Sequence, residues 1–243
     1  MRLDKFICKS TELTRNEAKK VLKSGEVRVN NEVAKNPAMQ VHENNVITID
    51  GQQLSARGSR YYILHKLADT ICSNVDEVYP SVLHGIEVDK AFDLHIAGRL
   101  DADTTGLVLV TDDGRWSHNV ISPKKQCEKT YRVWLRNEID DDNLSALVAQ
   151  FDTGLQLQGE SSLTRPALLT RVEKDDLVDE ASYRSEVLLT ITEGKYHQVK
   201  RMFAAVGNRV VGLHREQIGT ITLGDLAPGE WRELTENEIA QFS

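Results

Sequence analysis

Short apolar segments separated by turn-forming residues are the feature that most limits how this chain can fold. Each is four to six residues long, a length that suits a β-strand better than a buried helix. The predicted strands span residues 61–64, 107–111, 130–135, 187–192 and 209–213. Helical stretches are predicted near residues 141–150 and 196–206. Because the strands outnumber the helices and often follow one another closely, we predict an α+β domain on a largely antiparallel sheet.

The amino-terminal residues predict a separate small unit. Thr14 and Glu17 have the spacing of a capping box, which starts a helix predicted over residues 14–24. Period-two alternation over residues 26–33, around two asparagines that tolerate positive φ, predicts a hairpin, and residues 46–49 predict a third strand. We therefore divide the chain into a module of residues 1–52, a polar linker of residues 53–59 and a domain of residues 60–243.

Charge is distributed unevenly between these parts. Residues 1–35 contain nine Lys and Arg against five Asp and Glu, although the whole chain has a formal net charge of −7. The acidic total excludes a uniformly basic nucleic-acid coat protein and leaves room for a local basic patch. The module is therefore predicted to bind an anionic partner.

The chain has the composition expected of a protein in a reducing compartment. Its three cysteines stand far apart with no CxxC pair, which suits neither a disulfide framework nor a zinc site. No apolar run approaches the roughly 20 residues that cross a bilayer. The amino end carries Arg2, Asp4, Lys5 and Lys9 and lacks the uncharged core of a signal peptide. We expect a cytoplasmic protein with no membrane partner.

A row of basic side chains lies along one side of the helix predicted over residues 14–24. Its members are Arg15, Lys19, Lys20 and Lys23. A solvated helix face explains such a row without any ligand. A surface for RNA phosphates is the alternative, and the cationic segment in an anionic protein favours it. The segments LDKF (3–6) and SGEVRVN (24–30) resemble the S4 RNA-binding domain over roughly residues 1–50. The resemblance implies that the helix pair and the hairpin, with Arg28, contact structured RNA.

Two carboxylates and two hydroxyls precede the apolar strand at residues 107–110. Asp101 and Asp103, with Thr104 and Thr105, could simply cap the backbone of their own loop. A calcium site is a weaker alternative, because the glycine and later ligands of such a loop are missing. A glycoside hydrolase would use Asp101 and Asp103 as its two acidic groups, but nothing else indicates a sugar-binding cleft.

Three motifs decide between these alternatives. The segment GRLD (98–101) resembles the signature of pseudouridine synthases, and the match extends to CEKTY (127–131) and EGKYHQVKRM (193–202). The resemblance covers about residues 60–235 and, behind an S4-like module, is typical of the RsuA branch. It implies a catalytic domain on a largely antiparallel, mixed sheet. It also implies isomerisation of one uridine of 16S ribosomal RNA to pseudouridine, at uridine 516.

The resemblance assigns catalytic roles to three residues. Asp101 matches the catalytic aspartate, Tyr131 the tyrosine that stacks on the flipped base, and Lys200 the basic partner of the aspartate. A partly buried carboxylate stays charged when a cation lies beside it. Lys200 fits this role because it lies at the margin of the apolar stripe of its predicted helix. His197, like His214, is predicted to be structural.

Further residues are expected to contact RNA. Arg99 could fill the gap left by the departed base or bind phosphate. Lys195 and Arg201 are predicted to contact the RNA backbone. The partner is small-subunit ribosomal RNA or an assembling small subunit, and the protein is expected to act as a monomer. The chemistry exchanges no electron or group with a cofactor, so no cofactor or metal is expected.

One alternative function and one departure from the family remain. The alternative is a catalytically inactive RNA-binding assembly factor, disfavoured because Asp101, Tyr131 and Lys200 are all present.

The departure from the family lies at residues 65–69, which read HKLAD where the family usually has Asn-Lys-Pro followed by a glycine. Proline and glycine fix a turn at such a place.

Overall fold

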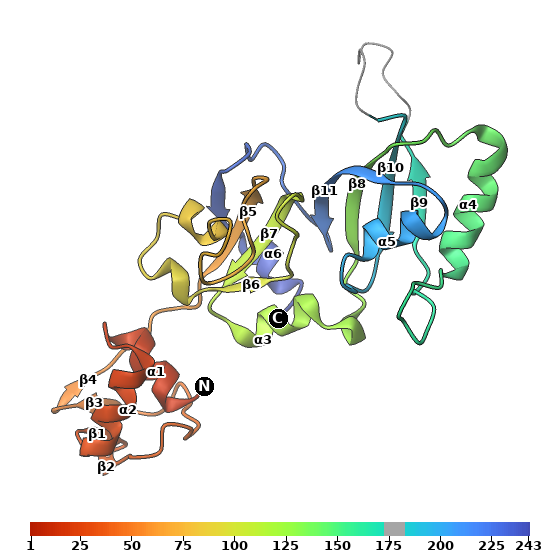
Figure 1. Cartoon of the computed structure of the whole chain (residues 1–243). Helices are drawn as coiled ribbons and strands as arrows, with labels where there is room; N and C mark the ends of the chain where they lie inside the picture. Colours follow the sequence, from red (N-terminus) through yellow and green to blue (C-terminus); the bar gives the residue numbers. More distant parts are fainter. Residues whose placement is uncertain (173–182) are drawn as a thin grey trace. The chain divides into compact units, whose positions relative to one another are not determined.

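The structure is a computed structural model of the chain and describes residues 1–172 and 183–243 (Figure 1). It divides into two compact units, Met1–Ser59 and Arg60–Ser243. Within the described ranges, none of the helices has both the length and the apolar character needed to span a membrane.

The first unit packs two helices on a small sheet. The helices are α1 (Leu3–Ser10) and α2 (Arg15–Ser24), and the sheet has the order β2-β1-β3-β4. Its strands are β1 (Val27–Val29), β2 (Glu32–Val33), β3 (Ile47–Ile49) and β4 (Gln52–Gln53). Apolar residues of α1, α2, β1 and β3 form a buried core of their own. Residue 53, assigned to the linker above, therefore pairs in a strand.

The local sequence signals of this unit are confirmed in atomic detail. The Thr14 side chain accepts from the Glu17 backbone N–H, and the Glu17 carboxylate accepts from the Thr14 N–H at 2.8 Å. The helix ends at Gly25 in the left-handed conformation, with φ of 85°. Asn30 and Asn31 adopt φ of 51° and 70° in the turn between β1 and β2. Short-range hydrogen bonding therefore determines where these elements begin and end.

The second unit is built on a mixed, largely antiparallel sheet, as predicted. Over the described residues this sheet has nine strands, with the main order β13-β5-β7-β11-β8-β10-β9, while β6 pairs with β7 and β12 with β11. The β7–β11 pair is parallel, and the other neighbouring strands in this sheet pair antiparallel. The strands are β5 (Tyr61–Lys66), β6 (His95–Ala97), β7 (Thr105–Thr111), β8 (Lys129–Leu135), β9 (Leu168–Arg171), β10 (Ser185–Ile191), β11 (Val210–Ile218), β12 (Ile221–Thr222) and β13 (Trp231–Glu233).

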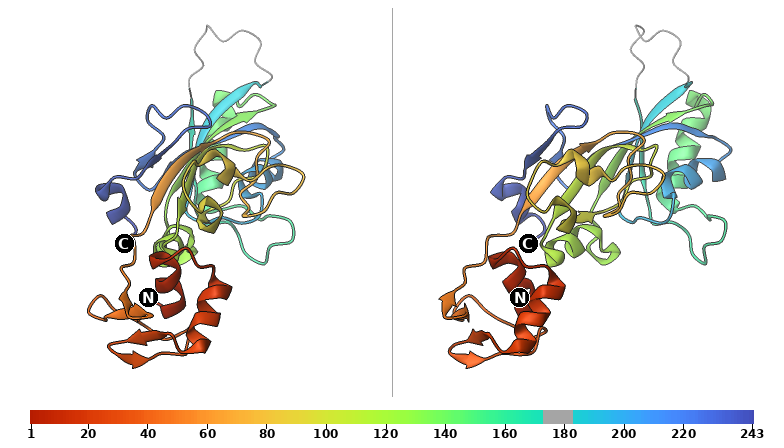
Figure 2. Two further views of the ribbon diagram at one scale, coloured as in Figure 1. Left: turned by 90° about the vertical axis from the view of Figure 1, so that its left-hand side faces the viewer. Right: turned by 60° about the vertical axis from the view of Figure 1, so that its left-hand side comes forward.

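Helices cover both faces of this sheet. They are α3 (Gly114–Ile121), α4 (Asp141–Thr153), α5 (Gln198–Ala205) and α6 (Glu236–Ala240), with short 3-10 turns at Val82–Gly85, Ala91–Asp93 and Pro123–Lys125. Strand β7 alternates between two cores: Val108 and Val110 pack in the core that includes α4 and α5, and Leu107 and Leu109 in the core that includes α3. The two side views show α4 and α6 on opposite sides of the sheet (Figure 2).

Helix α3 was not predicted from the sequence. The helix begins at Gly114, directly after Asp112 and Asp113. In the structure Asp113 caps α3 by accepting from the N–H groups of Arg115 and Trp116. Asp112 pairs with Arg60 at 3.0 Å. Both carboxylates therefore have structural partners.

Gly106 sets the distance between the two parallel strands. Its φ is 109°, and a Cβ atom at this position would lie 2.3 Å from the Arg215 carbonyl oxygen. Only glycine permits this approach, because any side chain would collide with the β11 backbone. The close contact holds the loop between β6 and β7, which carries Asp101, against β11.

Candidate active site

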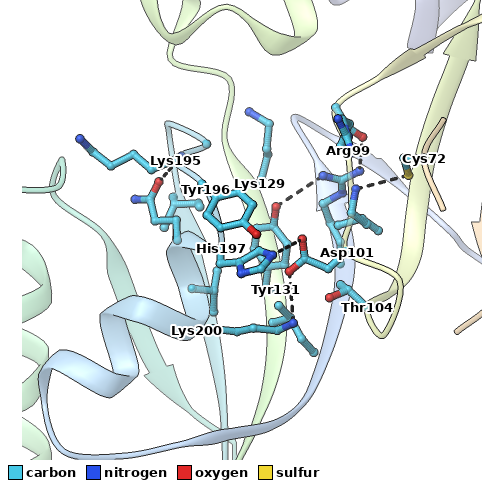
Figure 3. Close-up of a pocket in the computed structure, with 18 of the residues that line it drawn as sticks. Cys72, Arg99, Asp101, Thr104, Lys129, Tyr131, Lys195, Tyr196, His197 and Lys200 are labelled. Carbon is cyan, nitrogen blue, oxygen red and sulfur yellow. Dashed lines mark hydrogen bonds and ion pairs between the residues drawn. The ribbon is translucent and has the colours of Figure 1, made fainter. Parts of the chain in front are cut away.

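A cavity of about 680 Å³ lies in the second unit. Its walls come from the loop between β6 and β7, from β8 and β11, and from the segment that leads into α5. The three motifs singled out in the sequence all contribute to its lining. Figure 3 shows the side chains that face it.

Asp101 and Lys200 meet at this cavity. The Lys200 ammonium donates to Asp101 Oδ2 at 3.1 Å (Figure 3). It also donates to the two oxygens of Asp103 at 2.7 and 2.9 Å. Val199, Met202 and Phe203 are buried on α5 and turn Lys200 toward the edge of the core, as the helical spacing indicated. The expected pairing of cation and carboxylate is therefore present in the structure.

Hydrogen bonds stabilise the charges of this cluster. Burial disfavours the Lys200 charge, but its hydrogen bonds with Asp103 and Asp101 outweigh burial and raise the pKa of Lys200. Burial also opposes the Asp103 charge, and here the Lys200 hydrogen bond and charge prevail and lower the pKa of Asp103. The Lys200 ammonium and the Asp103 carboxylate therefore remain ionised around neutral pH.

His197 is a residue of this site that sequence reasoning set aside as structural. Its Nε2 atom lies 3.2 Å from Asp101 Oδ1, whereas Lys200 contacts the other oxygen of this carboxylate (Figure 3). It precedes α5 with φ of 47°, and its ring stacks on Tyr196 at a centroid distance of 3.8 Å. Its place within the third motif was the only sequence signal. His214, by contrast, bonds to Thr105 at 2.7 Å, and burial lowers its pKa.

Tyr131 lies on β8 with its side chain at the cavity and its residue 8% exposed. The buried Arg215 guanidinium supports it from β11, with Nη1 at 3.4 Å from the phenol oxygen. Arg215 also donates to the carbonyls of Leu107 at 2.8 Å and Gly98 at 3.1 Å. Sequence reasoning missed Arg215, a cation two residues beyond the strand predicted over residues 209–213. Arg215 therefore connects β11, the strand paired with β8, to Gly98 in the loop that carries Asp101.

Lys66 holds the Asp101 loop from the other side. Its buried ammonium donates to the carbonyls of Leu67, Ala102 and Thr104 at 2.9, 3.1 and 2.7 Å, and burial lowers its pKa. Asp69 adopts φ of 59° and donates its N–H to the Ala102 carbonyl at 2.9 Å. The turn therefore forms although the segment lacks the usual proline and glycine.

The basic residues expected to touch RNA differ in their surroundings. Arg99 is exposed at the cavity. Lys195 and Arg201 each pair with Glu160, at 3.0 and 2.9 Å, a partner that the sequence did not indicate. Contacts from these two to RNA would therefore compete with Glu160.

The basic residues of the first unit lie on its surface. Arg15, Lys19, Lys20 and Lys23 are exposed on α2, and Arg28 is exposed on β1. Arg28 also donates to the Asn31 carbonyl in the hairpin turn at 2.9 Å. The α2 row therefore forms a basic strip on this unit.

Comparison with known proteins identifies the families of both units. Residues 60–205 match the RNA pseudouridylate synthase family, and residues 1–47 match the S4 domain. The chain belongs to the pseudouridine synthases. Its relatives include the ribosomal small subunit pseudouridine synthase A of Vibrio cholerae, 51% identical, and that of Escherichia coli K12, 48% identical, with 99% or more of each chain covered. A solved pseudouridylate synthase of 43% identity superposes over all of both chains with a TM-score of 0.66.

This membership makes the protein an isomerase with an S4 domain, as the motifs indicated. It gives no support to the inactive assembly factor. For a pseudouridine synthase, the cavity offers a charged carboxylate, an aromatic ring and several cations around one space.

Proposed function

We propose that this pseudouridine synthase isomerises one uridine of 16S ribosomal RNA, with Asp101 as its catalytic carboxylate. The observation that carries the proposal is the position of Asp101 between Lys200 and His197, at the cavity that also contains Tyr131. The names of the full-length relatives supply the substrate class. We take uridine 516 as the target nucleotide, and the cytoplasm as the site of action, because that is where 16S RNA resides.

The geometry supports a sequence of steps in which each group has one task. A uridine within folded RNA must first be flipped out, which requires a few kcal/mol. Stacking on Tyr131 would return about 1–3 kcal/mol of this. Asp101, held beside Lys200, then acts on the sugar while the bond between N1 and C1′ breaks. The base turns, C5 bonds to C1′, and the C5 hydrogen leaves as a proton.

The S4 domain is proposed to anchor the RNA through the basic strip of α2. Phosphate neutralisation by Lys and Arg gives affinity without sequence specificity. Arg99, exposed at the cavity, is proposed to bind a phosphate next to the flipped nucleotide or to fill the gap left by the departed base.

Release of tritium from 16S RNA labelled at uracil C5 tests this function. The wild-type protein should release label, and Asp101→Asn should lose at least about 10³-fold in rate while keeping its RNA affinity. The matched control is Asp112→Asn, whose carboxylate pairs with Arg60 outside the cavity. Mapping of pseudouridine in RNA from cells with and without the gene identifies the nucleotide. Turnover by Asp101→Asn at the wild-type rate would contradict the assignment.

A further inference from the structure

Two buried cations share the face of the sheet that carries Tyr131. Lys129 precedes Tyr131 by two residues on β8, so both side chains point to the same side. Arg215 on β11 is the cross-strand partner of Tyr131. Lys129 is 7% exposed and Arg215 1%, and both line the cavity. The wall of the cavity that contains Tyr131 therefore carries two basic side chains, Lys129 and Arg215.

Neither cation has a carboxylate partner among residues 1–172 and 183–243. The Lys129 ammonium donates to the Cys127 carbonyl at 3.1 Å. Arg215 donates to two carbonyls and to the Tyr131 hydroxyl. Burial, with the repulsion of Arg215, lowers the pKa of Lys129. In contrast, the more exposed Lys195 and Lys200 both face carboxylates. Two buried like charges without an anion are unfavourable for folding, and such an arrangement marks a functional site.

The reaction itself produces an anion that fits this place. When the glycosidic bond breaks, its electron pair stays on uracil N1 and spreads to the O2 carbonyl. The detached uracil is planar and would remain beside Tyr131. The aliphatic side chains of Ile121 and Ile191 line the same cavity. Because Lys129 and Arg215 are both buried, their charges act more strongly there than they would in solvent. An RNA phosphate suits the exposed Arg99 better, because it need not lose its hydration there.

Resting on the proposed function, we propose that Lys129 and Arg215 stabilise the negative charge of the detached uracil. Both cations keep their protons and act through charge and hydrogen bonds. The electron pair that N1 receives in the cleavage is matched by the pair that C5 contributes to the new bond with C1′. C5 then loses its proton and N1 gains one, so that no oxidant or reductant is needed. This makes Lys129 and Arg215 catalytic residues that act on the leaving base.

The first experiment replaces Lys129 in the full-length protein. Lys129→Met keeps the aliphatic stem and removes the charge, and Lys129→Arg keeps a charge. At saturating RNA we expect Lys129→Met to slow tritium release by about 10²-fold, with RNA affinity within twofold of wild type and partial rescue in Lys129→Arg. Lys125→Met, an exposed lysine before β8, is the control and should be unaffected. An unchanged rate in Lys129→Met overturns the inference.

The second experiment measures the anion directly. The nitro group makes 5-nitrouracil acidic enough to be ionised at neutral pH, whereas thymine remains neutral. Wild type and Lys125→Met should bind 5-nitrouracil more tightly than thymine, and Lys129→Met should lose this preference. The inference is overturned if wild type shows no preference. It is also overturned if Lys129→Met weakens only the binding of inorganic phosphate, because the cations then serve the RNA backbone. Failure of the wild-type protein to release tritium refutes the proposed function instead.

Discussion

The Asp101 carboxylate and the Lys200 ammonium lie 3.1 Å apart although 99 positions separate them in the sequence. Asp101 lies on the loop before β7, and Lys200 lies on the first turns of α5. A charged carboxylate is held at the cavity by a cation from a distant element. The predictions that follow test this cluster and the surfaces that support it.

Removal of the Lys200 charge should reduce turnover. In Lys200→Met, the Asp101 carboxylate loses its cation, and its charged form becomes less favourable. We expect the rate of tritium release at saturating RNA to fall by about 10²-fold, and Lys200→Arg to retain part of the activity. Single-turnover kinetics with labelled RNA measure this. A rate in Lys200→Met equal to that of wild type would show that the ion pair has no part in catalysis.

His197 is expected to orient Asp101 from its second oxygen. His197→Ala removes the ring nitrogen that lies 3.2 Å from Asp101 and should lower the rate by about tenfold, which corresponds to about 1.4 kcal/mol. His197→Gln can still donate an N–H and should be less impaired. The comparison of both variants at saturating RNA separates the effect of the polar contact with Asp101 from the effect of the ring. Equal activity of His197→Ala and wild type would leave the histidine with its stacking role alone.

The Asp103–Lys200 pair predicts a pH dependence of stability. Because the folded protein holds the pKa of Asp103 below its ordinary value of 3.8, ionised Asp103 contributes stability above about that pH. This contribution is lost as the pH falls through the lower, folded-state pKa. The free energy of unfolding of wild type should therefore exceed that of Asp103→Asn at neutral pH, and the two should converge in acid. Denaturant titrations at several pH values test this, and a constant difference down to acid pH would disprove it.

Lys66 is expected to be a positioning residue for the Asp101 loop. Lys66→Met leaves three carbonyls without their buried donor, which should lower the free energy of unfolding by about 2–4 kcal/mol. Because the loop then loosens, the rate at saturating RNA should also fall while the KM for RNA changes little. Urea unfolding and steady-state kinetics provide the two readouts. The exposed Lys125→Met should shift stability by less than about 0.5 kcal/mol.

The basic strip of α2 should determine the salt dependence of RNA binding. Replacement of Lys19, Lys20 and Lys23 by Gln should weaken affinity and reduce the slope of log K against log salt by about 0.7–0.9 for each lost phosphate contact. The rate at saturating RNA should not change. Lys35→Gln, on the same unit outside α2, is the control. Identical slopes for the triple variant and wild type would show that this strip is a solvated face.

Local signals in the sequence were sufficient for much of the secondary structure. The capping box at Thr14, the hairpin turn and the strand at residues 130–135 depend on residues a few positions apart, and all appear as predicted. Boundaries were less accurate: β11 extends to Ile218 rather than ending at residue 213. Its later residues include Arg215 and Glu216, whose polar character conceals a strand until the neighbouring strands that accommodate them are known.

The sequence by itself determined the family, through three motifs behind an S4-like module, and named Asp101, Tyr131 and Lys200 as the residues to examine. Only the tertiary structure decided which groups surround them. His197 lies next to Asp101, and Glu160 forms ion pairs with Lys195 and Arg201. Lys129 and Arg215 are buried without a carboxylate partner among the described residues. The physical reason is that periodicity and capping act over a few residues, whereas these contacts depend on strand order and on the close parallel approach of β7 and β11 at Gly106.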